Sequence, residues 1–310
     1  MNRPRIAFAG TGEFAVPVLR ALTRAAEVVQ VITQPDRPAG RGLKPKAPPV
    51  KEAAQRLGLP VVQPRSINAP ETLNELGELD LDMLVTTAYG QLLKKPVLEL
   101  PRLGCLNVHA SLLPKYRGAA PVAWAIASGE RFTGVTVFLM DEGMDTGPIL
   151  LQRAVEIAPD ETRGELERRL AELGGELAVA AVQGHASGKL RPRPQPKEGS
   201  FAPRLKKEDA RIDWGWPAER VHNWVRAMNP WPSAFTYFRG RRLKLHRTRM
   251  GPELEGASGE LRPEGRRLFV ICGEGTVELV EVQPEGKRAM SALDFLNGYR
   301  PRPGESLVGS

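Results

Sequence analysis

Two hydrogen-bonding side chains, Asn107 and His109, stand two residues apart at the end of the short apolar run 105–108. This run predicts a buried strand, and the chain then enters a loop dense in Pro, Gly and Ser. In an extended chain, residues two apart point to the same side. Two donors aimed at one point are what acyl transfer needs for the oxygen that becomes negative. The pattern therefore indicates acyl-transfer chemistry at a strand end, where α/β folds place their sites.

Other interpretations of His109 are open at this point. A lone histidine is usually structural, but His109 lies between Asn107 and Ser111, whereas the other three histidines lack polar, glycine-rich neighbours. A zinc site is disfavoured because nothing supplies further ligands at a recognisable spacing. Ser-His-Asp hydrolysis is possible in principle, although Ser111 lies in Ser-Leu-Leu-Pro and not in a G-x-S-x-G elbow.

A second glycine-rich turn follows the predicted strand 134–140. Residues 141–148 read Asp-Glu-Gly-Met-Asp-Thr-Gly-Pro and carry three carboxylates, Asp141, Glu142 and Asp145. Carboxylates so close together can bind a metal ion, or a carboxylate such as Asp141 can shape the turn. We favour the second interpretation for Asp141 and expect no metal.

The elements around these turns predict an α/β fold with a mostly parallel, Rossmann-like sheet. The strand 6–9, the turn Gly-Thr-Gly and the strand 28–33 form a β-α-β unit that fits G-x-G-x-x-A. An acidic residue should end the second strand of a dinucleotide fingerprint, and Asp36 comes too late, so a tight strand-to-helix turn explains the glycines equally well. Further strands are expected at 61–62 and 82–86. A helix with a capping box at Thr162 and Glu165 continues to about residue 186.

Residues 34–51 predict a long loop with a net charge of +4. Such loops are usually functional or disordered. A solvated surface loop is one interpretation, and a mobile arm for phosphates is the one we favour. Its candidate phosphate-binding residues are Arg37, Arg41, Lys44 and Lys46.

The chain predicts a boundary within residues 189–204, where alternating prolines indicate an extended linker. We expect domains at 1–188 and 205–310. The second contains one helix, 218–228, and about five short strands, which suggests a small antiparallel, OB-like β-barrel. Six basic residues and no acidic one fall within 239–249. They indicate either an ordinary solvated edge strand or a groove that binds phosphates. Four of them are the candidate contacts Arg239, Arg241, Arg242 and Lys244.

The composition is that of an ordinary globular protein of 310 residues, 41% hydrophobic and 26% charged. No run approaches 18 apolar residues, and the N-terminus enters a strand at once, so we expect neither a membrane span nor a signal peptide. Cys105 and Cys272 are far apart and form no CxxC pair, so we expect them to be small buried side chains and not a disulfide or a metal site. The location we expect is cytoplasmic. The net charge is +8, of which +5 falls in residues 201–310. A basic second half indicates an anionic partner such as nucleic acid, unless the whole proteome is basic.

These residues resemble a known family. Asn107-x-His109-x-Ser111-Leu112-Leu113-Pro114-x-Tyr116-Arg117-Gly118, followed by Asp141-x-Gly143-x-Asp145-x-Gly147, is similar to the pattern of the folate-dependent formyltransferases. The stretches 34–42, 209–214, 229–232 and 292–298 resemble the branch of that family that acts on tRNA. The likeness covers nearly the whole chain.

The resemblance implies a Rossmann-like catalytic domain, 10-formyltetrahydrofolate as donor and the methionyl group on initiator tRNA as acceptor. By residue match it implies Asn107, His109 and Asp145 as the catalytic set. It also implies a folate-contacting segment made of Ser111, Leu112, Leu113 and Pro114. The enzyme would act in translation initiation, and nothing in the sequence requires more than a monomer.

Two alternatives stay open. The same chemistry could serve a small amine, such as an amino sugar nucleotide, but such an enzyme would not need the basic loop and the basic strand region. A non-catalytic RNA-binding barrel fused to a dinucleotide-binding domain would instead leave the Asn107 and His109 pattern without a role.

Overall fold

The computed structural model describes residues 3–39 and 44–307, which form two compact units. The first unit comprises Met1–Gly118, Thr133–Val155 and Glu167–Phe201. The second comprises Ala119–Phe132, Glu156–Leu166 and Ala202–Ser310. The second unit therefore includes two segments, 119–132 and 156–166, that interrupt the first unit along the chain.

The first unit is built on a seven-stranded sheet in the order β10-β9-β7-β6-β1-β2-β5. The neighbours from β7 to β5 are parallel, whereas β9 runs antiparallel to β7. The expected α/β class with a mostly parallel sheet is confirmed. Its strands are β1 (Arg5–Gly10), β2 (Glu27–Ile32), β5 (Val61–Val62), β6 (Met83–Thr87), β7 (Cys105–His109), β9 (Phe132–Leu139) and β10 (Ile149–Glu156).

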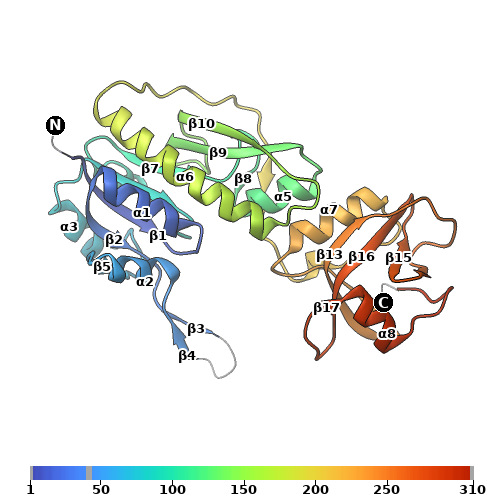
Figure 1. The fold of residues 1–310 in the computed structure, drawn as a ribbon. Helices are drawn as coiled ribbons and strands as arrows, with labels where there is room; N and C mark the ends of the chain where they lie inside the picture. The colour runs from blue at the N-terminus through green and yellow to red at the C-terminus, as the bar shows by residue number, and fades with distance from the viewer. Residues whose placement is uncertain (1–2, 40–43, 308–310) are drawn as a thin grey trace. The chain divides into compact units, whose positions relative to one another are not determined.

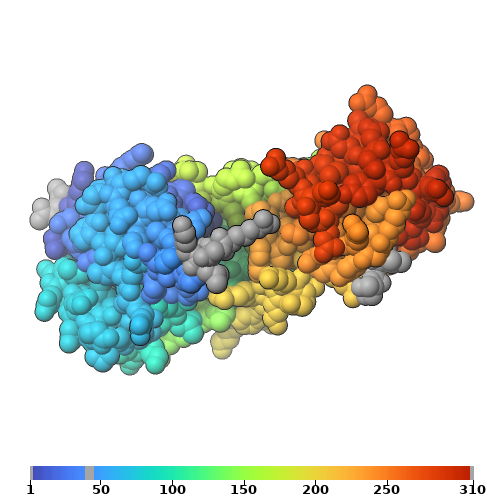
Figure 2. Space-filling view, turned by 90° about the horizontal axis from the view of Figure 1, so that it is seen from below, coloured from blue at the N-terminus to red at the C-terminus, as the bar shows by residue number. Residues whose placement is uncertain are grey.

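Helices cover this sheet. They are α1 (Ala15–Ala25), α2 (Pro49–Arg56), α3 (Pro70–Gly77), α4 (Lys95–Leu98) and α6 (Arg163–Ala186), of which α6 starts in the second unit. In Figure 1, α1 and α6 lie in front of the strands. They meet at Gly175, where a Cβ would stand 3.0 Å from Ala21 Cβ, so glycine permits the close approach. Figure 2 shows that the chain around α2 and α3 (light blue) makes up much of another face of this unit.

The basic stretch after β2 contains regular structure where we expected a loop. Strands β3 (Arg37–Ala39) and β4 (Lys44–Lys46) form an antiparallel hairpin that projects from the unit in Figure 1. Arg37 is paired with Lys46, and Pro38 with Pro45. Arg41 lies outside the described residues.

The second unit has a six-stranded antiparallel sheet in the order β12-β13-β16-β15-β14, with β17 beside β16. In residues 3–39 and 44–307 no pairing joins β12 to β14, so the sheet is not a closed barrel. The strands are β12 (Phe235–Phe238), β13 (Arg241–Met250), β14 (Leu261–Glu264), β15 (Arg267–Ile271), β16 (Thr276–Pro284) and β17 (Met290–Ser291). The helices of this unit are α5 (Pro121–Ala127), η1 (Glu208–Ala210), α7 (Ala218–Met228) and α8 (Ala292–Tyr299). Two short strands, β8 (Arg117–Gly118) and β11 (Phe201–Ala202), pair with each other where the chain passes from the first unit to the second.

Aromatic rings bring the segment 119–132 into the second unit. Trp124 of α5 packs edge to face on Trp224 of α7, with ring centroids 6.0 Å apart, and Trp224 packs likewise on Trp216 at 5.4 Å. Such aromatic pairs stabilise the fold by more than the burial of their apolar area alone. All five tryptophans of the chain lie in this unit, so its fluorescence reports on the second unit alone.

Hydrogen bonds around Thr162 and Glu165 hold the other inserted segment, 156–166, in the second unit. Glu165 Oε2 accepts hydrogen bonds from the Thr162 backbone N–H at 2.9 Å and from its hydroxyl at 2.7 Å, as expected. Glu165 Oε1 accepts from Arg247 of β13 at 2.5 Å. These bonds, the one from the Thr162 backbone first, lower the pKa of the Glu165 carboxyl to about 2.

Both cysteines are buried free thiols, and burial raises the pKa of each to about 12. This agrees with their expected role as small buried side chains. In the described part of the chain, no helix is both long and apolar enough to cross a membrane.

We predict that Glu165→Gln destabilises the second unit. Because the folded carboxyl has a lower pKa than an unfolded one, the charged form contributes stability above pH 4.5 and this is lost as the pH falls towards 2. Glu165 is about one-third exposed, so we expect a loss of only about 1–2 kcal/mol at pH 7. Urea unfolding followed by tryptophan fluorescence at pH 7, 5 and 3 measures it.

The matched control is Glu172→Gln, an exposed glutamate further along α6. It should leave unfolding of the second unit unchanged. Equal unfolding midpoints for the two variants at pH 7 would contradict the role given to Glu165.

Candidate active site

His109 stands at the end of β7 with its two ring nitrogens in different surroundings. Nε2 lies 2.8 Å from the carbonyl oxygen of Tyr116. A carbonyl oxygen can only accept, so Nε2 carries a hydrogen and donates it. Nδ1 lies 3.7 Å from Asp145 Oδ2, with both side chains largely buried. The structure therefore brings together two of the three predicted catalytic residues and leaves Nδ1 as the nitrogen that can exchange a proton.

Asp145 reaches His109 from the turn that follows β9. Its backbone has a φ of +55°, a left-handed conformation that aspartate adopts more readily than most residues. Asp145 Oδ2 accepts a hydrogen bond from the Gly118 backbone N–H at 2.7 Å. At Gly147 a Cβ would stand 1.8 Å from the Leu139 carbonyl oxygen, so this turn can close only with glycine.

Asp141 stabilises the same turn. Its Oδ1 accepts hydrogen bonds from the Gly143 N–H at 3.0 Å and the Thr146 hydroxyl at 2.7 Å. This is the shaping role expected for Asp141. Within the described residues, no group of three or more His, Cys, Asp or Glu side chains is placed to hold a metal ion.

Asn107 precedes His109 by two residues on β7 and is half-buried. Its amide donates to the hydroxyl of Thr86 on β6 at 2.8 Å. That hydroxyl also lies 3.3 Å from the sulfur of Met140. The amide is thus held by the neighbouring strand beside an apolar thioether, and it carries a second N–H.

The segment Ser111–Pro114 continues directly from β7. Ser111 Oγ donates to the Lys115 carbonyl at 2.6 Å, and the Leu113 N–H donates to Thr136 Oγ1 on β9 at 3.1 Å. Leu113 is buried, whereas Leu112 and Pro114 are half-buried. The predicted folate segment therefore lies beside the catalytic strand.

Of the predicted tRNA-binding residues of the first unit, the structure places Arg37, Lys44 and Lys46 on the hairpin. Arg37 and Lys46 are exposed and face each other across the two strands, and Lys44 belongs to β4. Like charges directly opposite each other destabilise a sheet, so an anionic partner would relieve their repulsion.

The predicted residues of the second unit differ in their surroundings. Arg239 is bound to Glu305 by two hydrogen bonds of 2.9 and 2.8 Å. Arg242 lies over the ring of Phe235 at 3.7 Å, and its Nε is buried. Arg241 is exposed and Lys244 is half-buried.

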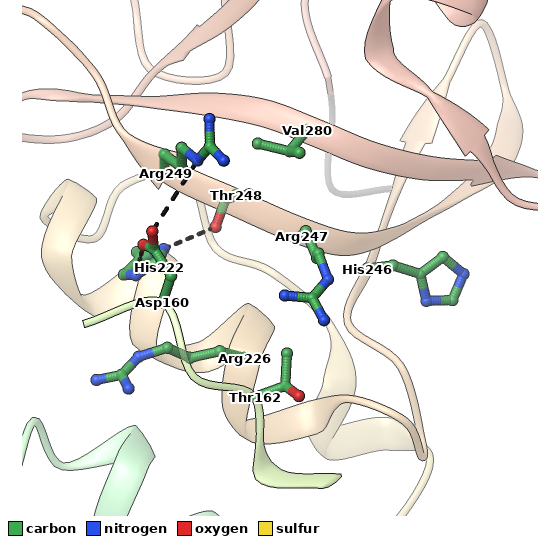
Figure 3. A pocket seen from close by; sticks show the side chains of 9 residues that line it. All are labelled: Asp160, Thr162, His222, Arg226, His246, Arg247, Thr248, Arg249 and Val280. Atoms are coloured by element: carbon green, nitrogen blue, oxygen red, sulfur yellow. Dashed lines mark hydrogen bonds and ion pairs between the residues drawn. The ribbon is translucent and has the colours of Figure 1, made fainter. Parts of the chain in front are cut away.

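A small pocket of about 50 Å³ lies beside β13 in the second unit (Figure 3). In Figure 3 the ring of His246 points away from the other side chains. Burial lowers the pKa of His222, and its two ring nitrogens each lie 3.0 Å from an oxygen, Thr248 Oγ1 and the Pro159 carbonyl. The pocket is lined by Asp160, Thr162, His222, Arg226, His246, Arg247, Thr248, Arg249 and Val280.

The arginines of this pocket are matched by acceptors of the second unit. Arg226 donates to Asn223 and to the carbonyls of Ala158 and Glu161. Arg247 binds Glu165, and Arg249 Nε lies 4.0 Å from an Asp160 oxygen. We therefore interpret the pocket as a charge network that holds the segment 156–166.

Several groups around the active site could not be predicted from the sequence. The Tyr116 carbonyl and the Gly118 N–H are backbone groups, so the identity of the side chain does not reveal them. Gln195 lies in the predicted linker, yet its Nε2 donates to the carbonyl of Asp145 at 3.0 Å. Only the tertiary fold brings these groups together.

Comparison with known families gives two matches. Residues 4–182 match the formyl transferase family, and residues 204–300 match the formyl transferase C-terminal domain. The chain is 49% identical to a methionyl-tRNA formyltransferase of Myxococcus xanthus over 98% of each chain. It is 46% identical to that of Citrifermentans bemidjiense, over 99% of this chain and 97% of the relative.

Solved structures with low sequence identity share the fold. An N-formyltransferase from Helicobacter canadensis, in complex with folinic acid and dTDP-3-aminofucose, has a TM-score of 0.69 at 20% identity, covering 92% of this chain and all of that one. HypX from Aquifex aeolicus, in complex with tetrahydrofolic acid, has a TM-score of 0.66 at 19% identity, covering 99% of this chain and 49% of that one. The two family matches and the full-length relatives show that the chain belongs to the formyl transferase family and, within it, to the folate-dependent methionyl-tRNA formyltransferases.

Proposed function

We propose that Asn107, His109 and Asp145 form the catalytic set of this enzyme. The reaction is that of its family: the formyl group of 10-formyltetrahydrofolate passes to the amino group of methionyl initiator tRNA, for translation initiation. One observation carries the proposal. Nδ1 of His109 and Oδ2 of Asp145 lie 3.7 Å apart, beside a strand that also presents the Asn107 amide.

Asn107 and His109 stabilise the oxygen of the formyl group. As the methionyl amine adds to the formyl carbon, that oxygen gains negative charge. The second N–H of Asn107 and the Nδ1–H of protonated His109 are suited to donate to it, since Nε2 is engaged by Tyr116. One such donor is typically worth about 10²–10³ in rate.

Asp145 handles positive charge and protons. Its carboxylate, next to Nδ1, stabilises the imidazolium form of His109 through charge attraction. Directly or through a water molecule, it also helps to remove the proton that the attacking amine must lose. The left-handed turn keeps the carboxylate in place for both tasks. The transfer is completed when the bond between the formyl carbon and N10 of the folate breaks and N10 takes up a proton, which gives tetrahydrofolate.

The residues around Asn107 fit a folate. 10-Formyltetrahydrofolate supplies the formyl carbon, and its flat ring system requires apolar walls and a few polar partners. Leu112 and Met140 offer half-buried apolar side chains. The Tyr89 hydroxyl is buried with no hydrogen-bond partner within residues 3–39 and 44–307. We propose that Ser111, Leu112, Leu113 and Pro114 contact the folate.

The hairpin is our candidate for gripping the tRNA in the first unit, through Arg37, Arg41, Lys44 and Lys46. The exposure of Arg37 and Lys46 supports this. Phosphate contacts of this kind supply affinity and orientation without reading the sequence.

In the second unit we propose that Arg239, Arg241, Arg242 and Lys244 follow the tRNA backbone. Arg239 should contribute least, since Glu305 already holds it. We also propose an OB-like curvature for the sheet, supported by the register shifts of β13 around Arg247.

We propose that residues 1–188 carry out catalysis and add a tRNA contact through the hairpin, that residues 205–310 bind the tRNA, and that residues 189–204 connect the two. The enzyme would work as a monomer in the cytoplasm, where initiator tRNA is charged.

We predict that Asn107→Ala lowers kcat by about 10²–10³, because a donor to the developing oxyanion is lost. The measurement is formylation of methionyl-tRNA by 10-formyltetrahydrofolate. Asn74→Ala, at an exposed position on α3, is the control and should match the wild type. A rate within threefold of wild type for Asn107→Ala would remove this residue from the catalytic set.

We predict that the double variant Arg37→Ala/Lys46→Ala raises KM for methionyl-tRNA and makes it less dependent on salt, by about one unit of logarithmic slope per lost contact. KM for the formyl donor should not change. Initial rates over a range of KCl concentrations measure both. Arg20→Ala, an exposed charge on α1, serves as the control, and identical salt slopes for it and the double variant would refute a tRNA contact by the hairpin.

A further inference from the structure

The segment 193–200, which we call the strap, is fastened to the first unit at both ends. At one end, Arg193 and Ile149 exchange backbone hydrogen bonds of 2.7 and 2.8 Å. At the other, Ser200 Oγ accepts from the Tyr116 N–H at 2.9 Å, and the Ser200 carbonyl accepts from the Arg117 N–H at 2.8 Å. These attachments are more than a linker between two domains requires.

Gln195, in the middle of the strap, binds the turn that carries Asp145. Its Nε2 donates to the Asp145 carbonyl at 3.0 Å and to the Gly147 carbonyl at 2.6 Å. Its Oε1 accepts from Arg117 Nη2 at 3.0 Å. Arg117 is buried, and it lies between Tyr116 and Gly118 in the sequence.

The strap thus joins the two chain segments that surround His109. One segment presents the Tyr116 carbonyl to Nε2 and the Gly118 N–H to the Asp145 carboxylate. The other presents Asp145 itself. The amide of Gln195 bridges both, through Arg117 on one side and two carbonyls on the other.

Two of the residues that surround His109 have left-handed backbone conformations, which need support from their surroundings such as the hydrogen bonds of Gln195. Asp145 has a φ of +55° and Tyr116 a φ of +60°. For residues other than glycine each costs of the order of 1–3 kcal/mol and persists only when its surroundings hold it. Gln195 supplies two of the hydrogen bonds that hold the Asp145 turn.

We propose that Gln195 is a positioning residue, which sets the distance between Asp145 and His109 by fixing the backbone of the Asp145 turn. Both polar atoms of its amide are bonded within the protein, so we expect it to act through Asp145, and the inference rests on the role proposed above for Asp145. A carboxylate displaced by about 1 Å can cost about 10²-fold in rate.

The test uses the full-length enzyme with methionyl-tRNA and 10-formyltetrahydrofolate. Gln195→Ala should lower kcat by about 10- to 100-fold and leave both KM values within about threefold. Gln195→Glu keeps an acceptor for Arg117 but cannot donate to the two carbonyls, so it should lose as much as Gln195→Ala. A Gln195→Glu enzyme with wild-type kcat would overturn the proposal.

Asp82→Ala controls for general destabilisation. Asp82 binds the Arg5 N–H at 2.9 Å and Arg102 at 2.5 Å at the amino ends of β1 and β6, the sheet edge opposite His109. It should lower the unfolding midpoint while kcat stays close to wild type. If Asp82→Ala lowers kcat as much as Gln195→Ala at equal loss of stability, the effect of Gln195 is merely structural and the proposal fails.

A double-mutant cycle separates this inference from the one on which it rests. Asp145→Asn should lose much of kcat, and adding Gln195→Ala to it should cost little more, because both changes remove the same interaction. A fully additive loss overturns the role of Gln195 and leaves that of Asp145 intact. Asp145→Asn with wild-type kcat overturns the catalytic set itself, and the positioning role with it.

Discussion

The hydrogen bond from His109 Nε2 to the carbonyl of Tyr116 decides which imidazole nitrogen can react. Because it commits Nε2, only Nδ1 can face Asp145 and the reacting atoms. The direction of that carbonyl depends on a left-handed backbone at Tyr116. The role proposed for His109 therefore depends on a backbone dihedral angle as much as on the identity of the side chains.

Local features of the fold were predictable from the sequence because hydrophobic periodicity and capping are local. Helix α7 has the bounds expected from the sequence, and the Glu165 side chain accepts from the Thr162 N–H, which is one of the two hydrogen bonds of the predicted capping box. For the site, the position of Asn107 and His109 at a strand end followed from their spacing, whereas Asp145 was assigned by family resemblance alone. The contributions of Tyr116 and Gln195 could not be predicted, since one is a backbone atom and the other depends on a tertiary contact.

Charge counting along the sequence had a similar limit. Six basic residues within 239–249 look like one basic surface, yet Arg239 binds Glu305 and Arg247 binds Glu165, 66 and 82 residues away. A sequence window cannot show such distant partners. The pair Arg247–Glu165 also explains how the second unit retains 156–166, just as the edge-to-face packing of indole rings retains 119–132. The chain therefore passes between its two units several times.

The strap has a consequence for how far this enzyme is modular. A fragment ending at residue 188, the expected domain boundary, would keep Asn107, His109 and Asp145 but lose every tie that Gln195 and Ser200 make. Chimaeras that exchange the tRNA-binding half would therefore have to be joined beyond Phe201, where the first unit ends. In the roles proposed for Asp145 and Gln195, the segment that follows residue 188 works together with the active site, so residues 1–188 alone would be a poor module for transfer to another protein.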